Sequence, residues 1–212
     1  LASAVRLGML IYLPTEERYC IPFPVRLSFE GVDFLEPLER DTLRLRAIRY
    51  FASLAHELAD EPDLATAKYW RFTNLLTAYE IAADMMEEVL GLEDESWHDF
   101  PHRVDSVPEP VASALLDFSA FLGKALVFRQ TEAGLRLLAA SAAAARTLKD
   151  EQAEARILGL VGQFHLRRDH FRSAIAAFRR WEQLCRVTGD RQGVVLALSA
   201  IAIAYREHGN SQ

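Results

Sequence analysis

The sequence predicts a mainly α-helical protein in which helical hairpins stack on one another, preceded by a short β-hairpin. Apolar residues recur at helical spacing from about Leu38 onward. The segments around Gly162 and Ala202 match at an offset of 40 in the numbering, and each combines a helix with a polar break. Small residues recur at positions 123, 162 and 202. A helical hairpin with two apolar faces must bury them against its neighbours, so these observations predict a solenoid.

The N-terminal segment, residues 1–36, differs from the rest of the chain. "LASAVRLG" is typical of a helix end closed by Gly8, and the runs 9–13 and 18–23 are rich in strand-forming residues. The tetrapeptide "PTEE" between the runs predicts a turn, so a β-hairpin is expected. Because the chain begins at Leu1 inside a helix end, we expect a piece of a larger protein.

Residues 37–90 predict a pair of helices separated by "EPD" at 61–63. The first has an apolar stripe formed by Leu43, Ala47, Tyr50, Phe51, Leu54 and Leu58. The second runs from about Leu64 to Val89, and its stripe consists of Ala67, Trp70, Leu75, Ala78, Ile81, Ala82 and Met85. An acidic, proline-containing loop over 91–110 follows.

Residues 111–212 contain the repeats, with helix breaks expected near Gln130, Asp150, Asp169 and Asp190. At an offset of 40, Leu158 matches Leu198, His165 matches Tyr205, and the break at Asp169 coincides with one at Gly209. The preceding unit fits with Gly123 one residue off this period. Its second helix fits at 40 through the pairs Gly134 and Ala174, Leu138 and Phe178, and Asp150 and Asp190.

Composition narrows the class of protein. The 212 residues are half hydrophobic and a quarter charged, which is ordinary for a soluble globular chain. The net charge of −6 argues against nucleic acid as the main partner. Cys20 and Cys185 are isolated, which favours a reducing compartment, and we expect a cytoplasmic protein. The longest apolar runs, 139–145 and 194–205, are too short to span a bilayer, so no membrane partner is expected.

The repeat units resemble tetratricopeptide repeats. The family's pattern of small and aromatic residues is matched by Gly162, Phe171, Ala174 and Phe178 and, in the next unit, by Ala202, Tyr205 and Gly209. His165, Asp169 and Trp181 replace the family's usual tyrosine, glycine and alanine. The offset of 40 is longer than the family's common repeat length of about 34 residues. The resemblance covers roughly 111–212 and implies a tetratricopeptide-like superhelix.

The N-terminal segment resembles the end of the winged-helix domain in signal-transducing NTPases of the NB-ARC (STAND) type. Arg18, Tyr19, Val25 and Arg26 match, while Ile21, Pro22 and Phe23 replace the family's methionine, histidine and aspartate. Since that histidine contacts nucleotide in the family, Pro22 removes the contact. Asn74, Leu75 and Ala78 match the helices that follow the winged helix. The resemblance implies an NTPase domain upstream of this chain.

Candidate chemistry is sparse. His98, Asp99, His102 and Asp105 form a cluster in which a His-x3-His spacing suits zinc on a helix. Pro101 interrupts that helix, so the alternative is a solvated acidic loop. The acidic residues Glu87, Glu88, Glu93, Asp94 and Glu95 are either a carboxylate pair or solvated surface. No nucleotide-binding, hydrolase or metalloprotease motif is present. We therefore expect no catalysis, no cofactor and no metal.

By the family resemblance, the first helix of each repeat lines a concave face. Facing inward there are Asp117 and the expected ligand-binding residues Lys124, Arg156, Gln163, Arg167, Ser199 and Arg206. Arginine and lysine in this setting hold carboxylates through charge-assisted hydrogen bonds. The alternative is that Arg156 and Arg206 pair with neighbouring acids. Similarly, the basic set Arg167, Arg168, Arg172, Arg179 and Arg180 is either an anion site or a solvated face.

The sequence thus predicts a non-catalytic sensor or scaffold segment that binds a protein or peptide and regulates a larger signalling protein. Its oligomeric state is left open. The alternative is a DNA-binding transcriptional regulator with a helical-repeat effector domain. In that case the N-terminal hairpin and Arg40, Arg44, Arg46 and Arg49 would touch DNA.

Overall fold

The computed structural model describes residues 11–13, 18–20, 37–59, 69–90 and 108–210. The helix end at Gly8, the break at 61–63, the side chain of Trp70 and the His98–Asp105 cluster lie outside the described residues. The chain divides into two compact units, Leu1–Asp41 and Thr42–Gln212. In the first unit, β1 (Ile11–Leu13) and β2 (Arg18–Cys20) pair antiparallel within the two runs for which strands are expected.

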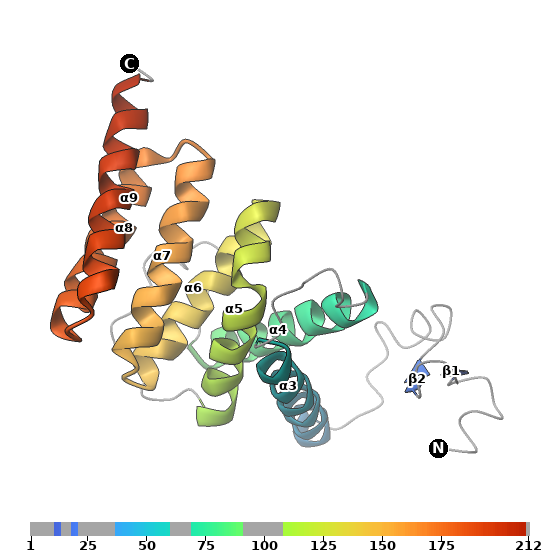
Figure 1. Cartoon of the computed structure of the whole chain (residues 1–212). Helices are drawn as coiled ribbons and strands as arrows, with labels where there is room; N and C mark the ends of the chain where they lie inside the picture. The colour runs from blue at the N-terminus through green and yellow to red at the C-terminus, as the bar shows by residue number, and fades with distance from the viewer. Residues whose placement is uncertain (1–10, 14–17, 21–36, 60–68, 91–107, 211–212) are drawn as a thin grey trace. The chain divides into compact units, whose positions relative to one another are not determined.

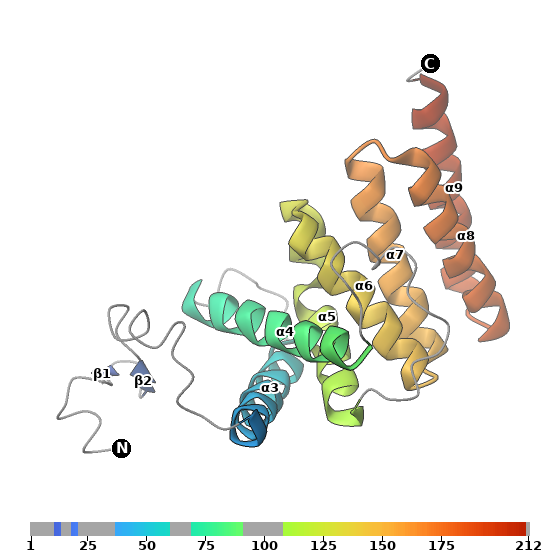
Figure 2. The same ribbon diagram turned by 180° about the vertical axis from the view of Figure 1, so that it is seen from behind.

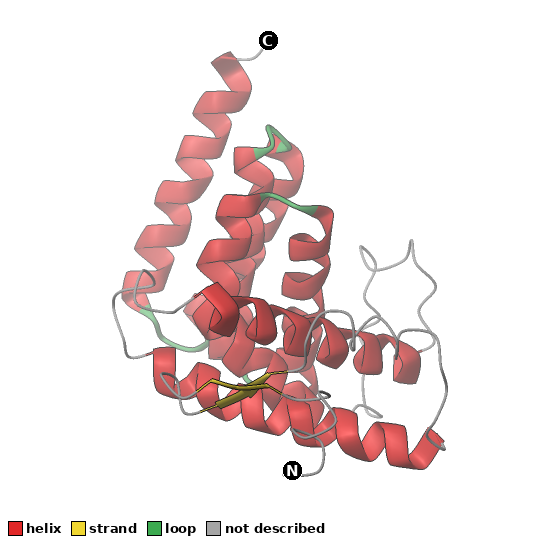
Figure 3. Cartoon of the chain, turned by 90° about the vertical axis from the view of Figure 1, so that its right-hand side faces the viewer, coloured by secondary structure: helices red, strands yellow, loops and turns green. Residues whose placement is uncertain are grey.

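The rest of the described chain is helical, which confirms a mainly α protein. The helices are α3 (Pro37–Ala59), α4 (Tyr69–Leu90), α5 (Glu109–Arg129), α6 (Glu132–Thr147), α7 (Glu151–Arg167), α8 (Phe171–Val187) and α9 (Arg191–Asn210). From α4 onward each helix packs on the next, and α5 also packs on α7. In Figure 1, α5, α7 and α9 lie in front of α6 and α8, and Figure 2 shows the reverse. Short turns join α5 through α9 (Figure 3).

The predicted period is visible in the turns. Each of the four turns between α5 and α9 has a residue of positive φ, the left-handed conformation typical of a helix end. Gln130 (φ 52°) and Asp169 (φ 59°) are related by an offset of 39 in the numbering. Lys149 (φ 56°) and Gly189 (φ 75°) are related by an offset of 40. The four expected breaks are therefore confirmed. The offsets between equivalent turns, 39 and 40, are the same two offsets that the sequence shows between its repeat units.

The helix starts repeat in the same way. Asp150 begins α7 as its N-cap and accepts a hydrogen bond from the backbone N–H of Ala153 at 2.8 Å. Asp190 does the same for α9 with Gly193, also at 2.8 Å. An aspartate in this position satisfies a backbone donor that has no partner inside the helix. The matched aspartates thus fix where the first helix of each unit begins.

Two of the three small residues lie at close helix contacts, as expected. A Cβ on Gly162 would come within 2.3 Å of the Phe178 ring, and one on Gly123 within 2.5 Å of Leu160. Ala202, by contrast, is exposed, so its expected role is wrong. Its neighbours Ala197 and Ala204 face the core instead. No helix follows α9 in the described chain, so nothing covers the face that carries Ala202.

Three further expectations need correction. The buried face of α3 consists of Ile48, Ala52 and Ala55, whereas Tyr50 is 67% exposed. Apolar residues lie all around this helix, so their spacing alone did not identify the buried side. The loop expected to end at residue 110 gives way to α5 at Glu109, because proline is tolerated in a first turn. The break expected at Gly209 comes one residue too early, since α9 includes Gly209 and ends at Asn210.

The main core extends from α3 to α7 and includes most of the largest fully buried side chains, such as Tyr79 and Phe118. At its centre lies α5, which has buried residues along most of its length. Among the described helices, α5 is long and apolar enough to cross a membrane by length and composition, although most of it is buried here. This helix is not among the uninterrupted apolar runs found in the sequence, because Asp117 and Lys124 interrupt its apolar residues.

Candidate functional site

A hollow of about 340 Å³ lies between α5 and α7. It brings together three of the predicted ligand-binding residues, Lys124 from α5 and Arg156 and Gln163 from α7. Trp181 reaches it from α8, and the remaining lining residues are Ser119, Ala120, Ile157, Gly159 and Leu160. The site is thus an apolar surface with two cations and a carboxamide around it.

Trp181 contributes to this surface because α7 has a glycine opposite it. A Cβ on Gly159 would lie 3.4 Å from the Trp181 indole, so the ring packs directly on the α7 backbone. Phe178 holds the ring from within α8, with ring centroids 6.2 Å apart. Trp181 also packs against both small hydrophobic clusters that join α7, α8 and α9. The sequence predicts Trp181 as a packing residue, and the structure adds that it lines the hollow.

The two cations at this hollow form no ion pair with a described residue. Lys124 and Arg156 are exposed, and within the described ranges neither forms an ion pair. The acid closest to Arg156 in sequence, Glu154, is buried and paired with Arg146 at 3.3 Å and Arg180 at 3.9 Å. The alternative for Arg156, that it pairs with a neighbouring acid, is therefore not what the structure shows. The two positive charges remain available to a ligand.

A second hollow, of about 230 Å³, lies beside the first. Arg156 and Trp181 line both hollows, so these two residues separate them. The other lining residues come from α7, α8, the turn after α8 and α9: Gln152, Ala155, Cys185, Thr188, Asp190, Gln192, Gly193 and Leu196. We call the two hollows together the trough. It crosses α7 from the α5 side to the α9 side.

Cys185 lines the second hollow, but its environment does not favour reactivity. Burial raises the pKa of the Cys185 thiol, and the nearby Asp190 carboxylate raises it further. The thiol also lies within hydrogen-bonding distance of Asp190, with sulfur and oxygen 3.9 Å apart. A thiolate, not a thiol, is the nucleophile in cysteine chemistry. Cys185 is therefore a packing residue of the trough.

The other expected ligand-binding residues line neither hollow. Arg167 lies over the exposed Phe128 ring, 4.5 Å from its centroid. Ser199 donates a hydrogen bond to the Val195 carbonyl within α9. Arg206 pairs with Glu207 at 2.8 Å, so the alternative interpretation holds for this residue.

The basic set around the start of α8 is likewise dispersed over separate contacts. Arg168 pairs with Glu132, Arg179 donates a hydrogen bond to the Tyr205 hydroxyl at 2.6 Å, and Arg180 lies 3.9 Å from Glu154. These arginines link helices to one another and do not converge on one anion site.

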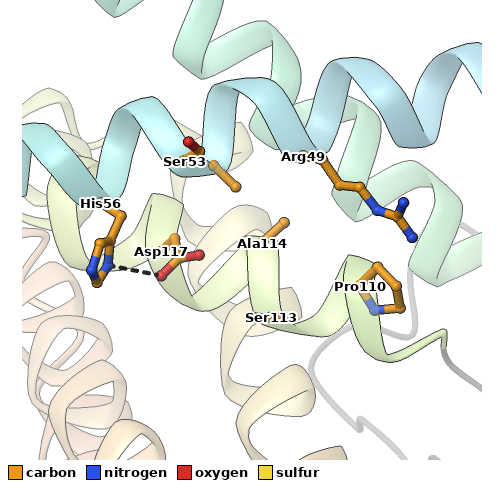
Figure 4. Close-up of a pocket in the computed structure, with 8 residues that line it drawn as sticks. Arg49, Ser53, His56, Pro110, Ser113, Ala114 and Asp117 are labelled. Carbon is orange, nitrogen blue, oxygen red and sulfur yellow. Dashed lines mark ion pairs between the residues drawn. The ribbon is translucent and has the colours of Figure 1, made fainter.

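A third hollow, of about 500 Å³, is open and lies between α3 and α5. Asp117, expected on the concave face, points here instead, and His56 faces it with Nδ1 3.6 Å from Oδ1 (Figure 4). Burial raises the pKa of Asp117, while His56 opposes the rise. Ser53 and Ser113 also line this hollow, but in the described chain neither hydroxyl bonds to His56. The arrangement therefore lacks a nucleophile joined to a base.

Within the described residues, no three His, Cys, Asp or Glu side chains gather where they could hold a metal ion. Sequence reasoning missed Gly159 and Leu196. The signal that could have identified Gly159 is its position three residues before Gly162, because a second glycine on that side of the helix leaves room for a large side chain of the partner helix. No family model, curated protein or solved structure matches this chain.

Proposed function

We propose that this chain is a non-catalytic, peptide- or protein-binding segment with tetratricopeptide-like architecture, and that its partner lies in the trough. The observation that carries the proposal is the pair Lys124 and Arg156. Both are exposed cations with no ionic partner in the described residues, and they flank an apolar surface formed around Trp181. Tryptophan and arginine are enriched among the residues that contribute most of the binding energy at protein interfaces.

The chemistry of the hollow suits a carboxylate-bearing peptide. Lysine and arginine bind carboxylates through charge-assisted hydrogen bonds, which are stronger than neutral ones. The Gln163 carboxamide both donates and accepts, as a peptide backbone requires. Trp181, Ile157 and Leu160 supply apolar area for a neighbouring side chain. No residue at this site has the arrangement of a nucleophile or general base, so the proposal is recognition without chemical conversion.

The wider context follows from the N-terminal resemblance and is part of the same proposal. In a signal-transducing NTPase, a helical-repeat segment downstream of a winged helix senses a ligand. By the same logic, a partner in the trough would regulate an upstream NTPase or output domain. Of the arginines in the DNA-binding alternative, Arg44 is paired with Glu88 at 3.3 Å, and no observation favours that alternative.

The test is a binding measurement with charge reversal. Fluorescein-labelled twelve-residue peptides composed of Asp, Glu, Leu, Phe and Gly are titrated with the protein, and anisotropy is recorded. We expect Lys124→Glu/Arg156→Glu to weaken binding at least tenfold, because each lost charge-assisted bond contributes about 1.5–3 kcal/mol. Arg46→Glu/Arg172→Glu changes the net charge equally at exposed positions outside the trough and should leave binding within about twofold.

Two results would contradict the proposal. One is the absence of binding by every peptide in the set. The other is equal weakening by both double variants, which would mean that only net charge matters. A duplex DNA probe in the same assay covers the alternative function, since DNA binding would fall steeply with salt.

A further inference from the structure

The two halves of the trough differ in chemistry. The first hollow has both cations, Lys124 and Arg156. The second shares Arg156, and its α9 wall consists of Gln192, Gly193 and Leu196. Leu196 is 52% exposed and is the large apolar residue of that wall, and Ala155 and Trp181 add apolar area from α7 and α8. Ile203, another exposed aliphatic residue, lies two turns after Leu196 on the same face of α9. Cationic character on the α5 side therefore gives way to aliphatic character on the α9 side.

The acid at the second hollow strengthens this difference. Asp190 lines it, and its carboxylate accepts the α9 capping hydrogen bond from Gly193. A ligand carboxylate placed there would face a like charge, which is unfavourable. An acidic ligand group therefore belongs in the first hollow, between Lys124 and Arg156. An apolar ligand group belongs in the second, against Leu196.

The distance between the two positions sets the ligand's spacing. The hollows lie on either side of α7, and packed helices have axes about 8–10 Å apart. An extended chain advances about 3.3 Å per residue. The acidic and apolar side chains should therefore be two to four residues apart, with Trp181 beneath the segment that joins them.

Resting on the proposed function, we infer that the trough selects an extended peptide segment in which an acidic residue and an aliphatic residue are two to four positions apart. The acidic side chain binds between α5 and α7, and the aliphatic side chain binds against α9. The trough specifies the two side chains and the spacing between them. It does not specify the direction of the peptide, so the acidic residue can come before or after the aliphatic one. Neither an acidic segment alone nor an apolar segment alone fills both hollows.

The experiment uses labelled, amide-terminated peptides with a Gly-Ser background and the full chain. One set contains Glu and Leu at spacings of two, three, four and eight, in both orders, and the others contain Glu alone or Leu alone. We expect the best peptide with a spacing of two to four to bind at least tenfold more tightly than either single-residue peptide. A peptide with a spacing of eight should bind only as tightly as the peptide that contains Glu alone.

A matched pair of variants locates the aliphatic position. Leu196→Gln should remove the gain due to the peptide leucine and leave binding of the Glu-only peptide unchanged. Leu198→Gln alters a similarly exposed leucine of α9 that does not line the trough, so it should keep the gain. Circular dichroism confirms that both variants are folded.

The outcomes separate this inference from the proposed function. If the Glu-only peptide binds as tightly as the paired peptides, or if both leucine variants act alike, the inference is wrong and carboxylate recognition stands. If a spacing of eight binds as well as three, the two-hollow geometry is wrong. If no acidic peptide binds at all, the proposed function itself is wrong.

Discussion

Two glycines in α7 make room for two aromatic side chains from α8. Gly162 faces Phe178 and Gly159 faces Trp181. Glycine in a helix interior costs about 1 kcal/mol relative to alanine. A buried aromatic ring removes a large apolar area from water and offsets that cost. Both pairs let α7 and α8 approach closely, and one of them, Gly159 with Trp181, also lines the trough.

Replacing Gly162 by alanine tests this close approach. The new Cβ would clash with the fully buried Phe178 ring, and overpacking of this kind costs about 1–3 kcal/mol. We expect the free energy of unfolding in urea to fall by that amount. Gly209→Ala is the control, since its Cβ meets nothing within 4 Å and alanine favours a helix. A Gly162→Ala protein as stable as the control would contradict the packing described here.

At the scale of elements, the sequence was sufficient to predict helix boundaries where nearby side chains determine them. Asp150 and Asp190 marked the starts of two helices because their side chains cap a backbone donor nearby. The predicted stripe of α3 was right for Phe51 and Leu54, which pack against the core, and wrong for Tyr50, because burial depends on what the helix packs against. The resemblance to tetratricopeptide repeats predicted Lys124, Arg156 and Gln163 on one face, and they do line one hollow. Leu196 was missed because its role depends on how α9 is rotated against its neighbours.

Asp117 and His56 connect α3 to α5 and predict a dependence of stability on pH. Burial raises the pKa of Asp117 above its ordinary value of 3.8, so the fold favours the protonated carboxyl. Its contribution to stability is complete below pH 3.8 and is lost as pH rises through the raised folded-state pKa. Asp117→Asn should therefore be more stable than wild type at pH 7, by a margin that shrinks towards pH 4.

Urea unfolding of both proteins between pH 4 and pH 7 measures that margin. Other carboxyl groups titrate in both proteins, so the difference between the two curves isolates Asp117. The His56 side chain is 80% exposed, so solvent screens its attraction for the Asp117 carboxylate. A margin that stays constant over this range would contradict the raised pKa of Asp117.

Across Thr42–Gln212, the hydrophobic core is uneven. One large cluster joins α3 through α7, whereas two small clusters, which share Trp181, join α7, α8 and α9. In stacked helical repeats, stability is close to a sum of terms from each unit and its neighbours. Large apolar side chains of α9, including Val195, Leu196 and Leu198, remain exposed. The C-terminal end should therefore be the least stable part of this unit.

Native-state hydrogen exchange tests this gradient along the helices. We expect amides of α9 to exchange through openings of lower free energy than those of α5 and α6, because local opening of α9 exposes only small clusters. Phe178→Leu should lower the opening free energy of α8 and α9 while changing α5 little, since Phe178 belongs to a C-terminal cluster. Because the trough crosses α7 to reach α9, a bound peptide should protect α9 most. Equal protection from α5 to α9 would show that the helices unfold as one cooperative body instead.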